Sequence, residues 1–388
     1  MSRPAPTPHV FSRPAPKPVS LELEERLILT LYSQRHLPEA ERAARSLTER
    51  APSHGFGWKA LGLILRDQDR AQEALPVMQH AAKLLPRDPE AFNNLGVLLE
   101  ALKQPEHALP CYEHAIQVKP DFWLGLNNLC SLLHRQGKTE ELLPLLERKL
   151  ALRPDDGVVQ HEIAMLSGRQ TDSAPAAYIT DVFDHYAERF DAHLQNDLRY
   201  QVPQQLAAWL KEHAPTPSGW RVLDLGCGTG LLSEPLKGLC SELVGIDLSG
   251  KMLEKARERG GHTRLEQADV LTQMQREADA SFDAIVAADV FIYVGKLDAV
   301  LREAQRLLTP GGMLAFSVES MEKASPQATA DDLQRGHRLE RSGRYSHADA
   351  RLRQQAAEAG FTVVRQEDST LREEHKLPVN GQLVLWRK

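Results

Sequence analysis

The chain has 388 residues, more than one ordinary hydrophobic core accommodates, so at least two domains are expected. A hydrophobic fraction of 42% and a charged fraction of 26% exclude a disordered chain. No apolar run reaches the ~20 residues needed to span a bilayer. The formal net charge of −6 argues against a broad nucleic-acid-binding face. We therefore predict a cytoplasmic globular protein that does not bind membranes or nucleic acid.

The cysteines do not form a CxxC pair or a cluster with histidine at zinc-ligand spacing. Their neighbours are largely apolar, which is typical of small core residues. We predict reduced thiols, no disulfide and no metal site. The residues are Cys111, Cys130, Cys227 and Cys240.

Residues 1–20 are rich in proline and contain the motif SRPAP twice, beginning at Ser2 and Ser12. So much proline excludes helix and disfavours sheet. We predict a disordered, polyproline-like tail, with a ligand for a proline-binding domain as the alternative interpretation.

From residue 21 onward the sequence repeats with a period of 34 residues. Small residues recur where two helices approach closely, leucines recur in the seam between them, and a proline closes each unit. This pattern is typical of tetratricopeptide repeats. We predict an all-α solenoid over residues 21–170, with about four repeats and a capping helix within residues 155–168. The recurring positions are Leu27, Leu61, Leu95 and Leu129; Leu31, Leu65, Leu99 and Leu133; Ala40, Ala74 and Ala108; and Pro52, Pro86, Pro120 and Pro154.

Residues 171–177 break the period and are interpreted as a linker. Beyond them, helical patterns alternate with short β-branched runs, which indicates an α/β domain over residues 178–388. We predict a Rossmann-like, seven-stranded, mostly parallel sheet whose last strand is antiparallel. The runs are residues 221–225, 242–247, 263–267, 282–288, 313–318, 362–366 and 382–386.

The first of these strands runs into a glycine-rich turn with the sequence VLDLGCGTG, residues 222–230. Glycine permits positive φ and lets backbone N–H groups approach a ligand. The spacing differs from the GxGxxG of dinucleotide-binding folds. An acid within the strand would repel a pyrophosphate, but it suits a cationic ligand. The candidate binding residues are Asp224, Gly226, Cys227, Gly228 and Gly230.

This turn resembles motif I of class I S-adenosylmethionine-dependent methyltransferases, and further segments resemble that family in the same order. They are LVGIDLS at residues 243–249, QADV at 267–270, FDAIVAADVFIY at 282–293 and LLTPGGM at 307–313. The resemblance implies a class I methyltransferase domain with S-adenosylmethionine as cofactor.

The resemblance also implies roles for individual residues. Asp247, followed by Leu248, would accept both ribose hydroxyls, since a carboxylate offers two acceptors to a vicinal diol. Asp269 would accept the adenine amino group and Val270 would donate its backbone N–H, while Ala288 would lie beside the cofactor after the fourth strand. For each acid the alternative interpretation is an ordinary strand-end or helix-capping residue.

An aromatic-rich segment, residues 178–190, precedes the glycine-rich turn. In related small-molecule methyltransferases a similar segment covers the cofactor as a lid, which would exclude water from the methyl group. Tyr178, Tyr186 and Arg189 would then contact the ligand. The alternative is a helix that only packs onto the domain.

Acceptor-binding residues are expected at the carboxyl edge of the sheet. Asp289 and Tyr293 follow the fourth strand, and Arg344, Tyr345 and His347 precede the sixth. His347 or Tyr293 could serve as a general base, because a histidine titrates near neutrality. Arg344 and Tyr345 could orient an anionic or aromatic acceptor. In the alternative interpretation Ser346 caps a helix over residues 348–359 and His347 lies in its first turn.

The segment Gly-Arg-Tyr-Ser-His at residues 343–347 resembles one in predicted bacterial methyltransferases that carry tetratricopeptide repeats. No Asn/Asp-Pro-Pro-Tyr motif follows the fourth strand, which disfavours methylation of nucleic-acid bases or glutamine. O-, C- or carboxyl-methylation of a small molecule remains open.

The repeats add a predicted peptide-binding groove. Asn93 and Asn127 lie one period apart and, with the adjacent Asn94 and Asn128, could hold a peptide backbone. The alternative is that one asparagine of each pair ties neighbouring helices together. Basic residues in the same helices would favour an acidic partner: Lys59, Arg66, His134 and Arg135.

These features are compatible with three alternative functions. The first is a methyltransferase acting on a small molecule, with repeats that mediate protein interaction. The second is a protein methyltransferase whose substrate the repeats capture. The third is a repeat adaptor with a non-catalytic cofactor-binding domain.

Overall fold

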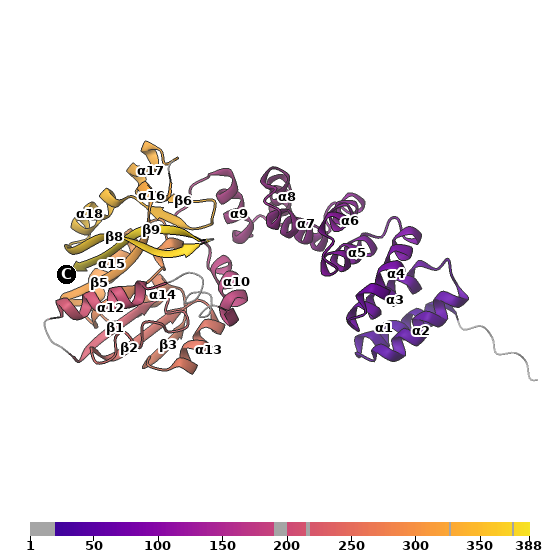
Figure 1. Ribbon diagram of the computed structural model, residues 1–388, viewed down its shortest axis with the longest axis horizontal. Helices are drawn as coiled ribbons and strands as arrows, with labels where there is room; N and C mark the ends of the chain where they lie inside the picture. Colours follow the sequence, from indigo (N-terminus) through magenta and orange to yellow (C-terminus); the bar gives the residue numbers. More distant parts are fainter. Residues whose placement is uncertain (1–19, 190–199, 215–217, 326, 375) are drawn as a thin grey trace, which may run out of the picture. The chain divides into compact units, whose positions relative to one another are not determined.

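The computed structural model describes residues 20–189, 200–214, 218–325, 327–374 and 376–388 (Figure 1). The predicted Pro-rich tail thus lies almost wholly outside the described residues. The chain forms two compact units, Met1–Leu145 and Leu146–Lys388. Within the described part of the chain, no helix has both the length and the apolar character needed to cross a membrane.

The first unit consists of helices, of which the first seven pack consecutively, each against the next. One proline of the 34-residue period follows each pair, where its missing N–H ends the helical hydrogen bonding. The predicted helical repeats are therefore confirmed. The helices are α1 (Leu21–Ser33), α2 (Leu37–Arg50), α3 (Gly55–Asp67), α4 (Ala71–Leu84), α5 (Pro89–Ala101), α6 (Pro105–Val118), α7 (Trp123–Arg135) and α8 (Thr139–Leu152), the last of which extends past Leu145.

The small residues of the period allow the two helices of each repeat to approach closely. A Cβ on Gly96 in α5 would lie 2.6 Å from Cε1 of Tyr112 in α6, and a Cβ on Gly62 in α3 would lie 2.5 Å from Cγ of Met78 in α4. Tyr112 is fully buried, and its hydroxyl donates to Glu100 Oε1 at 2.7 Å. The ring therefore has little freedom to move, whereas the Met78 side chain can change rotamer.

Gly96→Ala is expected to destabilise the first unit by about 1–3 kcal/mol, because overpacking against the fixed Tyr112 ring exceeds the gain in helix propensity. Gly62→Ala is the matched control, and we expect it to change stability by less than about 1 kcal/mol. Thermal unfolding of the full chain followed by circular dichroism measures both. Equal effects of the two substitutions would contradict this explanation of the period.

The second unit is an α/β fold in which helices alternate with strands. The helices are α9 (Gly157–Ser167), α10 (Ala176–Tyr186), η1 (Ala187–Arg189), α12 (Val202–His213), α13 (Gly250–Arg259), α14 (Val270–Met274), η2 (Phe291–Tyr293), α15 (Asp298–Leu307), α16 (Met321–Ala324), α17 (Ala330–Arg335) and α18 (Asp349–Glu358). The strands are β1 (Trp220–Leu225), β2 (Cys240–Asp247), β3 (Arg264–Gln267), β4 (Phe282–Ala287), β5 (Leu308–Ser320), β6 (His337–Leu339), β7 (Tyr345–His347), β8 (Thr362–Glu374) and β9 (Leu377–Arg387).

The sheet has the order β3-β2-β1-β4-β5-β7-β6, and its first five strands are parallel. β9 pairs antiparallel with β5, and β8 with β9, so the predicted mostly parallel sheet with an antiparallel last strand is confirmed. The described residues form nine strands where seven were predicted. The two additional strands, β6 and β7, have only three residues each, too few for a period to be recognised.

Apolar residues that alternate along the strands fill a core on each face of the sheet. Leu223 and Leu225 of β1 pack in one cluster with residues of α15 and α18. Val222, which directly precedes Leu223, packs in another cluster with residues of α12. This alternation follows from the period of two in a strand. The loops after the parallel strands are left at one edge of the sheet.

Helix α9 lies where a capping helix was predicted, but it belongs to the second unit, so the division between the units falls upstream of the predicted boundary at residues 170–178. His161 Nε2 donates to the carbonyl oxygen of Gly343 at 3.2 Å, and the ring of His161 lies 4.6 Å from that of Tyr178. The predicted linker is also fixed, since the Ala174 N–H donates to Tyr293 O at 2.9 Å. These tertiary contacts are not visible in the repeat pattern.

Candidate cofactor and acceptor site

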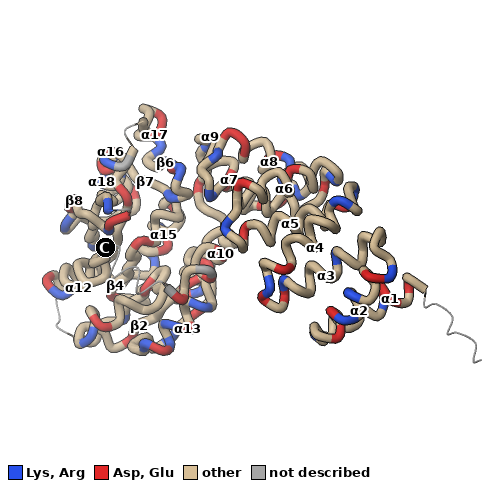
Figure 2. Tube along the Cα trace, turned by 45° about the vertical axis from the view of Figure 1, so that its right-hand side comes forward, with Lys and Arg blue, Asp and Glu red and all other residues tan. Residues whose placement is uncertain are grey.

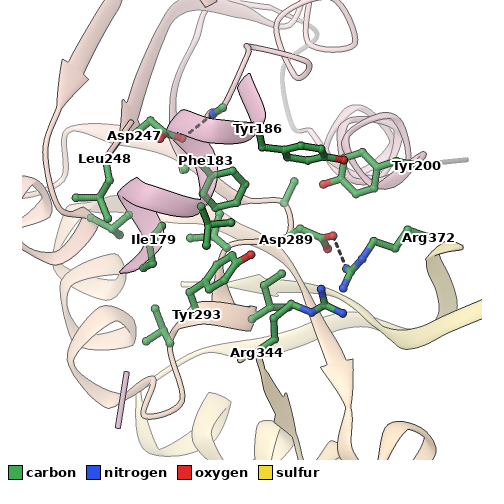
Figure 3. A pocket seen from close by; sticks show the side chains of 18 of the residues that line it. Ile179, Phe183, Tyr186, Tyr200, Asp247, Leu248, Asp289, Tyr293, Arg344 and Arg372 are labelled. Carbon is green, nitrogen blue, oxygen red and sulfur yellow. Dashed lines mark hydrogen bonds and ion pairs between the residues drawn. The ribbon is translucent and has the colours of Figure 1, made fainter. Parts of the chain in front are cut away.

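A cavity of about 440 Å³ opens at the edge of the sheet where β1, β2 and β4 end (Figure 3). Gly226 and Gly228 of the glycine-rich turn line it. Both adopt positive φ, and a Cβ on Gly226 would lie 2.6 Å from Val290 Cγ2. Any other residue at this position would therefore be strained and would collide with the loop after β4. Because glycine has no side chain, main-chain atoms form this wall of the cavity.

Asp247, at the end of β2, is hydrogen-bonded to this turn. Its Oδ2 accepts from the Gly228 N–H and its Oδ1 from the Ser249 N–H, both at 2.8 Å. Burial raises the pKa of Asp247 to about 6, although both backbone N–H groups favour the ionised form. Asp247 and Leu248 both line the cavity, as predicted.

Asp224 does not line the cavity. Its side chain is 4% exposed, and its Oδ2 lies 3.1 Å from Nε2 of His262, whose side chain is 1% exposed. Burial raises the pKa of Asp224, and His262 opposes that rise. The prediction that Asp224 faces a cationic ligand is not supported by this geometry, because Asp224 points to the face of β1 that His262 covers. Cys227 and Gly230 are likewise absent from the lining.

Asp269, Val270 and Ala288 complete the wall near Asp247. Asp269 also caps α14, since its Oδ1 accepts from the Thr272 N–H at 2.9 Å. Asp269 therefore has the helix-capping role of the alternative interpretation, and it also lines the cavity where the predicted cofactor contact would lie.

Helix α10 covers the cavity with the side chains of Ile179, Val182, Phe183 and Tyr186. Asp184, on the same helix, accepts from Ser249 Oγ at 2.5 Å, which attaches α10 to the start of α13. The predicted covering segment is thus in place. Tyr178 faces α9 instead of the cavity, and the side chain of Arg189 lies outside the described residues.

The opposite wall carries charged residues from distant parts of the chain, and Figure 3 shows Arg344 and Arg372 side by side there. Arg344 pairs with Glu319 at 2.9 Å and with Glu374 at 2.7 Å. Arg372 pairs with Asp289 at 2.6 Å, with Glu374 at 2.8 Å, and also with Glu319. Burial opposes the charge of Arg372, but the three carboxylates outweigh it and hold its pKa above the usual range. These ion pairs fix the shape of the wall.

Asp289 is held in a left-handed conformation with φ of +58°. Its N–H donates to Ser317 Oγ at 2.9 Å, and that hydroxyl donates to Asp289 Oδ1 at 2.9 Å. Such a strained backbone persists only where neighbours fix it. Tyr293 lies further along the same loop and packs edge-on against Phe183, with ring centroids 5.6 Å apart. Both residues line the cavity, as predicted.

His347 and Tyr345 were predicted to act at the site, but the structure does not bring either to the cavity. Both lie in β7 and are at most 1% exposed. His347 Nε2 donates to Val294 O at 3.0 Å, and the Tyr345 hydroxyl lies 2.6 Å from Thr171 Oγ1. Ser346 is a strand residue and does not cap α18, whose N-cap is Ala348. These residues hold the loop after β4 in position.

The pH dependence of stability tests this role of His347. Burial, with a smaller contribution from His337, lowers the pKa of His347 from 6.5 to about 4. Below pH 6.5 the unfolded chain binds a proton that the folded chain excludes, so stability is lost as the pH falls from 6.5 toward 4. We expect His347→Gln to remove about 3 kcal/mol of this pH dependence, measured by urea unfolding between pH 7 and pH 4.5. The exposed His107→Gln should leave the profile unchanged.

Several lining residues were not predicted from the sequence. Val294 and Tyr200 lie outside the quoted motifs, Ile292 lies within residues 282–293 but was not singled out, and Arg372 and Glu374 lie in the final strand pair. The only available signal was the run of alternating charges in the last strand pair, which is equally typical of a solvent-facing strand.

In the repeats, Asn128 Nδ2 donates to Asn93 Oδ1 at 2.8 Å, so Asn93 ties α5 to α7. The alternative interpretation is correct for this pair. Asn94 and Asn127 are half-buried, and no side-chain hydrogen bond is found for either among the described residues. Three of the four basic residues predicted to favour an acidic partner are engaged in ion pairs: Lys59 with Asp88 and Glu90, Arg66 with Asp67, and Arg135 with Glu100.

Comparison with known proteins finds matching families for both parts of the chain. Residues 223–316 match the family described as "Methyltransferase domain", and residues 89–122 and 126–159 match tetratricopeptide-repeat families. The chain therefore carries tetratricopeptide repeats followed by a methyltransferase domain.

The curated relatives of this chain include ubiquinone biosynthesis O-methyltransferases. The protein from Xanthomonas oryzae pv. oryzae is 38% identical over 104 residues, which cover 26% of this chain and 43% of that protein. The protein from Bordetella avium is 30% identical over 138 residues, which cover 35% and 54%. The chain thus spans about half the length of the curated relatives it matches.

Among solved structures, an S-adenosylmethionine-dependent methyltransferase from Mesorhizobium loti is 24% identical and covers 47% of this chain and 98% of its own, with a TM-score of 0.38. Magnesium protoporphyrin IX methyltransferase from Synechocystis PCC 6803 is 20% identical and covers 55% and 99%, with a TM-score of 0.41.

Proposed function

We propose that the chain is an S-adenosylmethionine-dependent methyltransferase that methylates a small anionic or hydroxylated acceptor. The observation that carries the proposal is one cavity with two different ends. Asp247 and Asp269 lie beside the glycine-rich turn, whereas Arg344 and Arg372 lie across from them. Such a volume with a few polar groups is typical of a small-molecule site.

The residues at the first end fit the cofactor. Asp247 offers acceptors for a diol, Asp269 offers an acceptor for an amino group, and the wall of Gly226 and Gly228 admits a ligand against backbone. The match of residues 223–316 to a methyltransferase domain supports the same assignment. When bound, S-adenosylmethionine supplies an electrophilic methyl group to a nucleophilic acceptor.

The second end supports an acceptor with a flat apolar part and an anionic or polar head. Phe183, Tyr293 and Ile292 provide apolar contact, and Arg344 and Arg372 provide N–H donors. Holding the acceptor nucleophile in line with the methyl group supplies most of the catalysis in such a transfer. The similarity to ubiquinone biosynthesis O-methyltransferases supports oxygen as the methylated atom.

The general bases that the sequence predicted are not available at this end of the cavity. Burial raises the pKa of the Tyr293 hydroxyl, so it keeps its proton near neutrality, and Asp289 is occupied by Arg372. His347, the predicted base, is buried against Val294 O. An acceptor that is already ionised, such as a carboxylate or an acidic phenol, would need no base.

We propose further that the repeats bind a protein segment through Asn94 and Asn127, which retain free amide groups among the described residues. If the repeats delivered a protein acceptor, loss of these groups would reduce methylation of protein. If the acceptor is a small molecule, the same loss would leave its methylation unchanged.

Incubation of cell extract with methyl-labelled S-adenosylmethionine and the full chain tests both proposals. We expect label in the small-molecule fraction, at equal rates for the wild type and Asn94→Ala/Asn127→Ala. Label mainly in macromolecules, reduced by that double substitution, would favour a protein methyltransferase. Label in neither fraction above a no-enzyme control would contradict methyl transfer and favour the adaptor function.

A further inference from the structure

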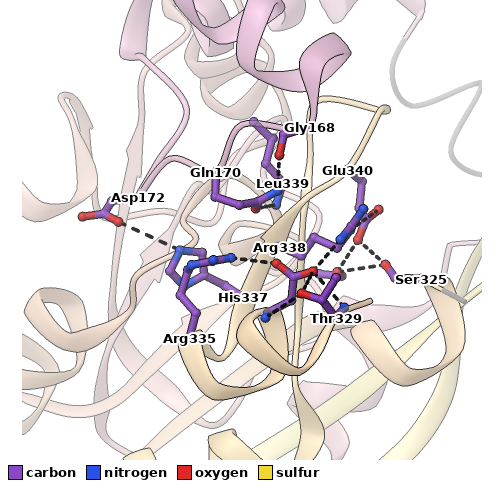
Figure 4. Close-up of polar contacts among 12 residues, drawn as sticks. Gly168, Gln170, Asp172, Ser325, Thr329, Arg335, His337, Arg338, Leu339 and Glu340 are labelled. Carbon is purple, nitrogen blue, oxygen red and sulfur yellow. Dashed lines mark hydrogen bonds and ion pairs between the residues drawn. The ribbon is translucent and has the colours of Figure 1, made fainter. Parts of the chain in front are cut away.

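A second cavity, of about 550 Å³, lies behind the loop that carries Tyr293. It is formed where α15, the turn from α17 into β6, and α18 meet the segment after α9; Figure 4 shows Asp172, Arg335 and His337 of this group. It shares no lining residue with the first cavity. The lining residues are Asp172, Lys296, Asp298, Arg302, Arg335, His337, Arg351 and Gln355.

Basic side chains dominate this lining. Lys296, Arg302, Arg335 and Arg351 supply four cations, against the two carboxylates of Asp172 and Asp298. Elsewhere, Figure 2 shows basic and acidic residues interspersed along both units. A cluster with an excess of positive charge is therefore distinctive in a chain with a net charge of −6.

Two of these cations are not engaged by other side chains. Lys296 and Arg302 are exposed, and neither has an ion-pair partner within 4.0 Å in the part of the chain that the structure describes. Arg335 pairs with Asp332 through Nη1 at 2.8 Å, and Arg351 pairs with Glu358 at 2.9 Å. Because a guanidinium has five N–H donors, both arginines keep donors for a further acceptor.

The inner wall contains polar atoms that are buried and unsatisfied. The side chain of His337 is 5% exposed, and neither its Nε2 nor Oε1 of the buried Gln355 has a hydrogen-bond partner among the described residues. The nearest charged group to His337 Nε2 is Asp172 Oδ1, at 4.0 Å. Burial lowers the pKa of His337, and the positive charge of Arg335 lowers it further. Unsatisfied buried polar atoms beside a cavity indicate a ligand that would pair with them.

Backbone geometry holds this group in place. Gly336 has a φ of +87°, and a Cβ there would lie 2.4 Å from Cγ of Arg351, so the arginine stem passes directly over the glycine. A Cβ on Gly295 would lie 2.6 Å from Cδ2 of His337. The main chain of Lys296 is fixed as well, because its N–H donates to Asp172 O at 2.8 Å.

We propose that this second cavity binds a phosphate group of a small ligand, separate from the cofactor and the acceptor. Donors from three elements converge on it, which suits a dianion with several acceptor oxygens better than a planar carboxylate. The segment Tyr293–Val294–Gly295–Lys296 runs from the acceptor cavity to this one, so a bound phosphate would contact the loop that forms the acceptor wall. The proposal does not depend on methyl transfer.

Calorimetric titration of the full chain with inorganic phosphate, pyrophosphate and ADP, each at ionic strength matched with KCl, tests the proposal. The variant is Lys296→Gln/Arg302→Gln, whose exposed and unpaired side chains leave folding intact. The matched control is Lys83→Gln/Arg257→Gln, which changes the charge equally at exposed positions elsewhere.

We expect at least one of the three probes to bind the wild type at one site per chain. The same probe should bind the variant with an affinity at least about tenfold lower. The control should bind like the wild type. The probe that binds most tightly identifies the source, since inorganic phosphate alone, a diphosphate and a nucleotide are compared directly. Absence of saturable binding by all three, or equal affinity in the variant and the wild type, would overturn the proposal.

Discussion

Arg372→Met is expected to destabilise the second unit by about 3–5 kcal/mol, because it leaves carboxylates unpaired in a buried site. The Arg372 side chain is 4% exposed and pairs with Asp289, Glu319 and Glu374. Without it, three carboxylates would face one another beside the single charge of Arg344. Some of them would then take up protons or draw in water, and the wall would lose its shape.

Urea unfolding of the full chain measures this loss. The matched control is Arg365→Met on the same strand, where the side chain is 32% exposed and pairs with Glu212 and Glu367. Exposed ion pairs contribute about 1 kcal/mol or less, so the control should change stability little. Equal effects of the two substitutions would show that the arginine network is not a structural element of the site.

Asp247→Asn is expected to weaken S-adenosylmethionine binding roughly 100-fold. The substitution removes a charged acceptor, and hydrogen bonds to charged groups contribute about 1.5–3 kcal/mol each. It also places an amide N–H opposite the Gly228 or Ser249 N–H, which now donate to the carboxylate at 2.8 Å. The glycine-rich turn would therefore lose its support as well as its acceptor.

The pH dependence of S-adenosylmethionine affinity provides a second test of the role of Asp247. The pKa of Asp247 is raised to about 6, so the ionised carboxylate that we propose as a cofactor ligand is lost as the pH falls through 6. Wild-type affinity should therefore decrease below that pH, and Asp247→Asn should be insensitive to it. Calorimetric titration at pH 8 and pH 5 tests both statements. The exposed Asp279→Asn is the control, and it should behave like the wild type throughout.

Sequence reasoning succeeded where a function depends on residues close together in the chain. The repeats were predicted because each pair, such as Gly96 and Tyr112, lies within one 34-residue unit. The turn after β1 and the acid at the end of β2 were predicted for the same reason, since the carboxyl ends of neighbouring parallel strands bring Gly228 and Asp247 together.

Residues that act through tertiary packing were not predicted correctly. Arg372 meets Asp289 across 83 positions, and nothing in either local segment indicates the pair. His262 covers Asp224 across 38 positions, which moved that acid from the predicted ligand site to the core. His347 has the residue type of a general base, but pairing of β6 with β7 buries it. Residue type and order in the chain do not determine which face of a short strand points to the cavity.

The most direct test of the central claim is hydrogen exchange of the full chain with and without saturating S-adenosylmethionine. We expect slower exchange of backbone amides at residues 226–230, 247–249, 269–270 and 288–294, the segments that carry lining residues of the first cavity. Asp247→Asn should abolish this protection at the same cofactor concentration. Unchanged exchange at these amides in the wild type, or protection confined to the repeats, would contradict the assignment of this cavity to the cofactor.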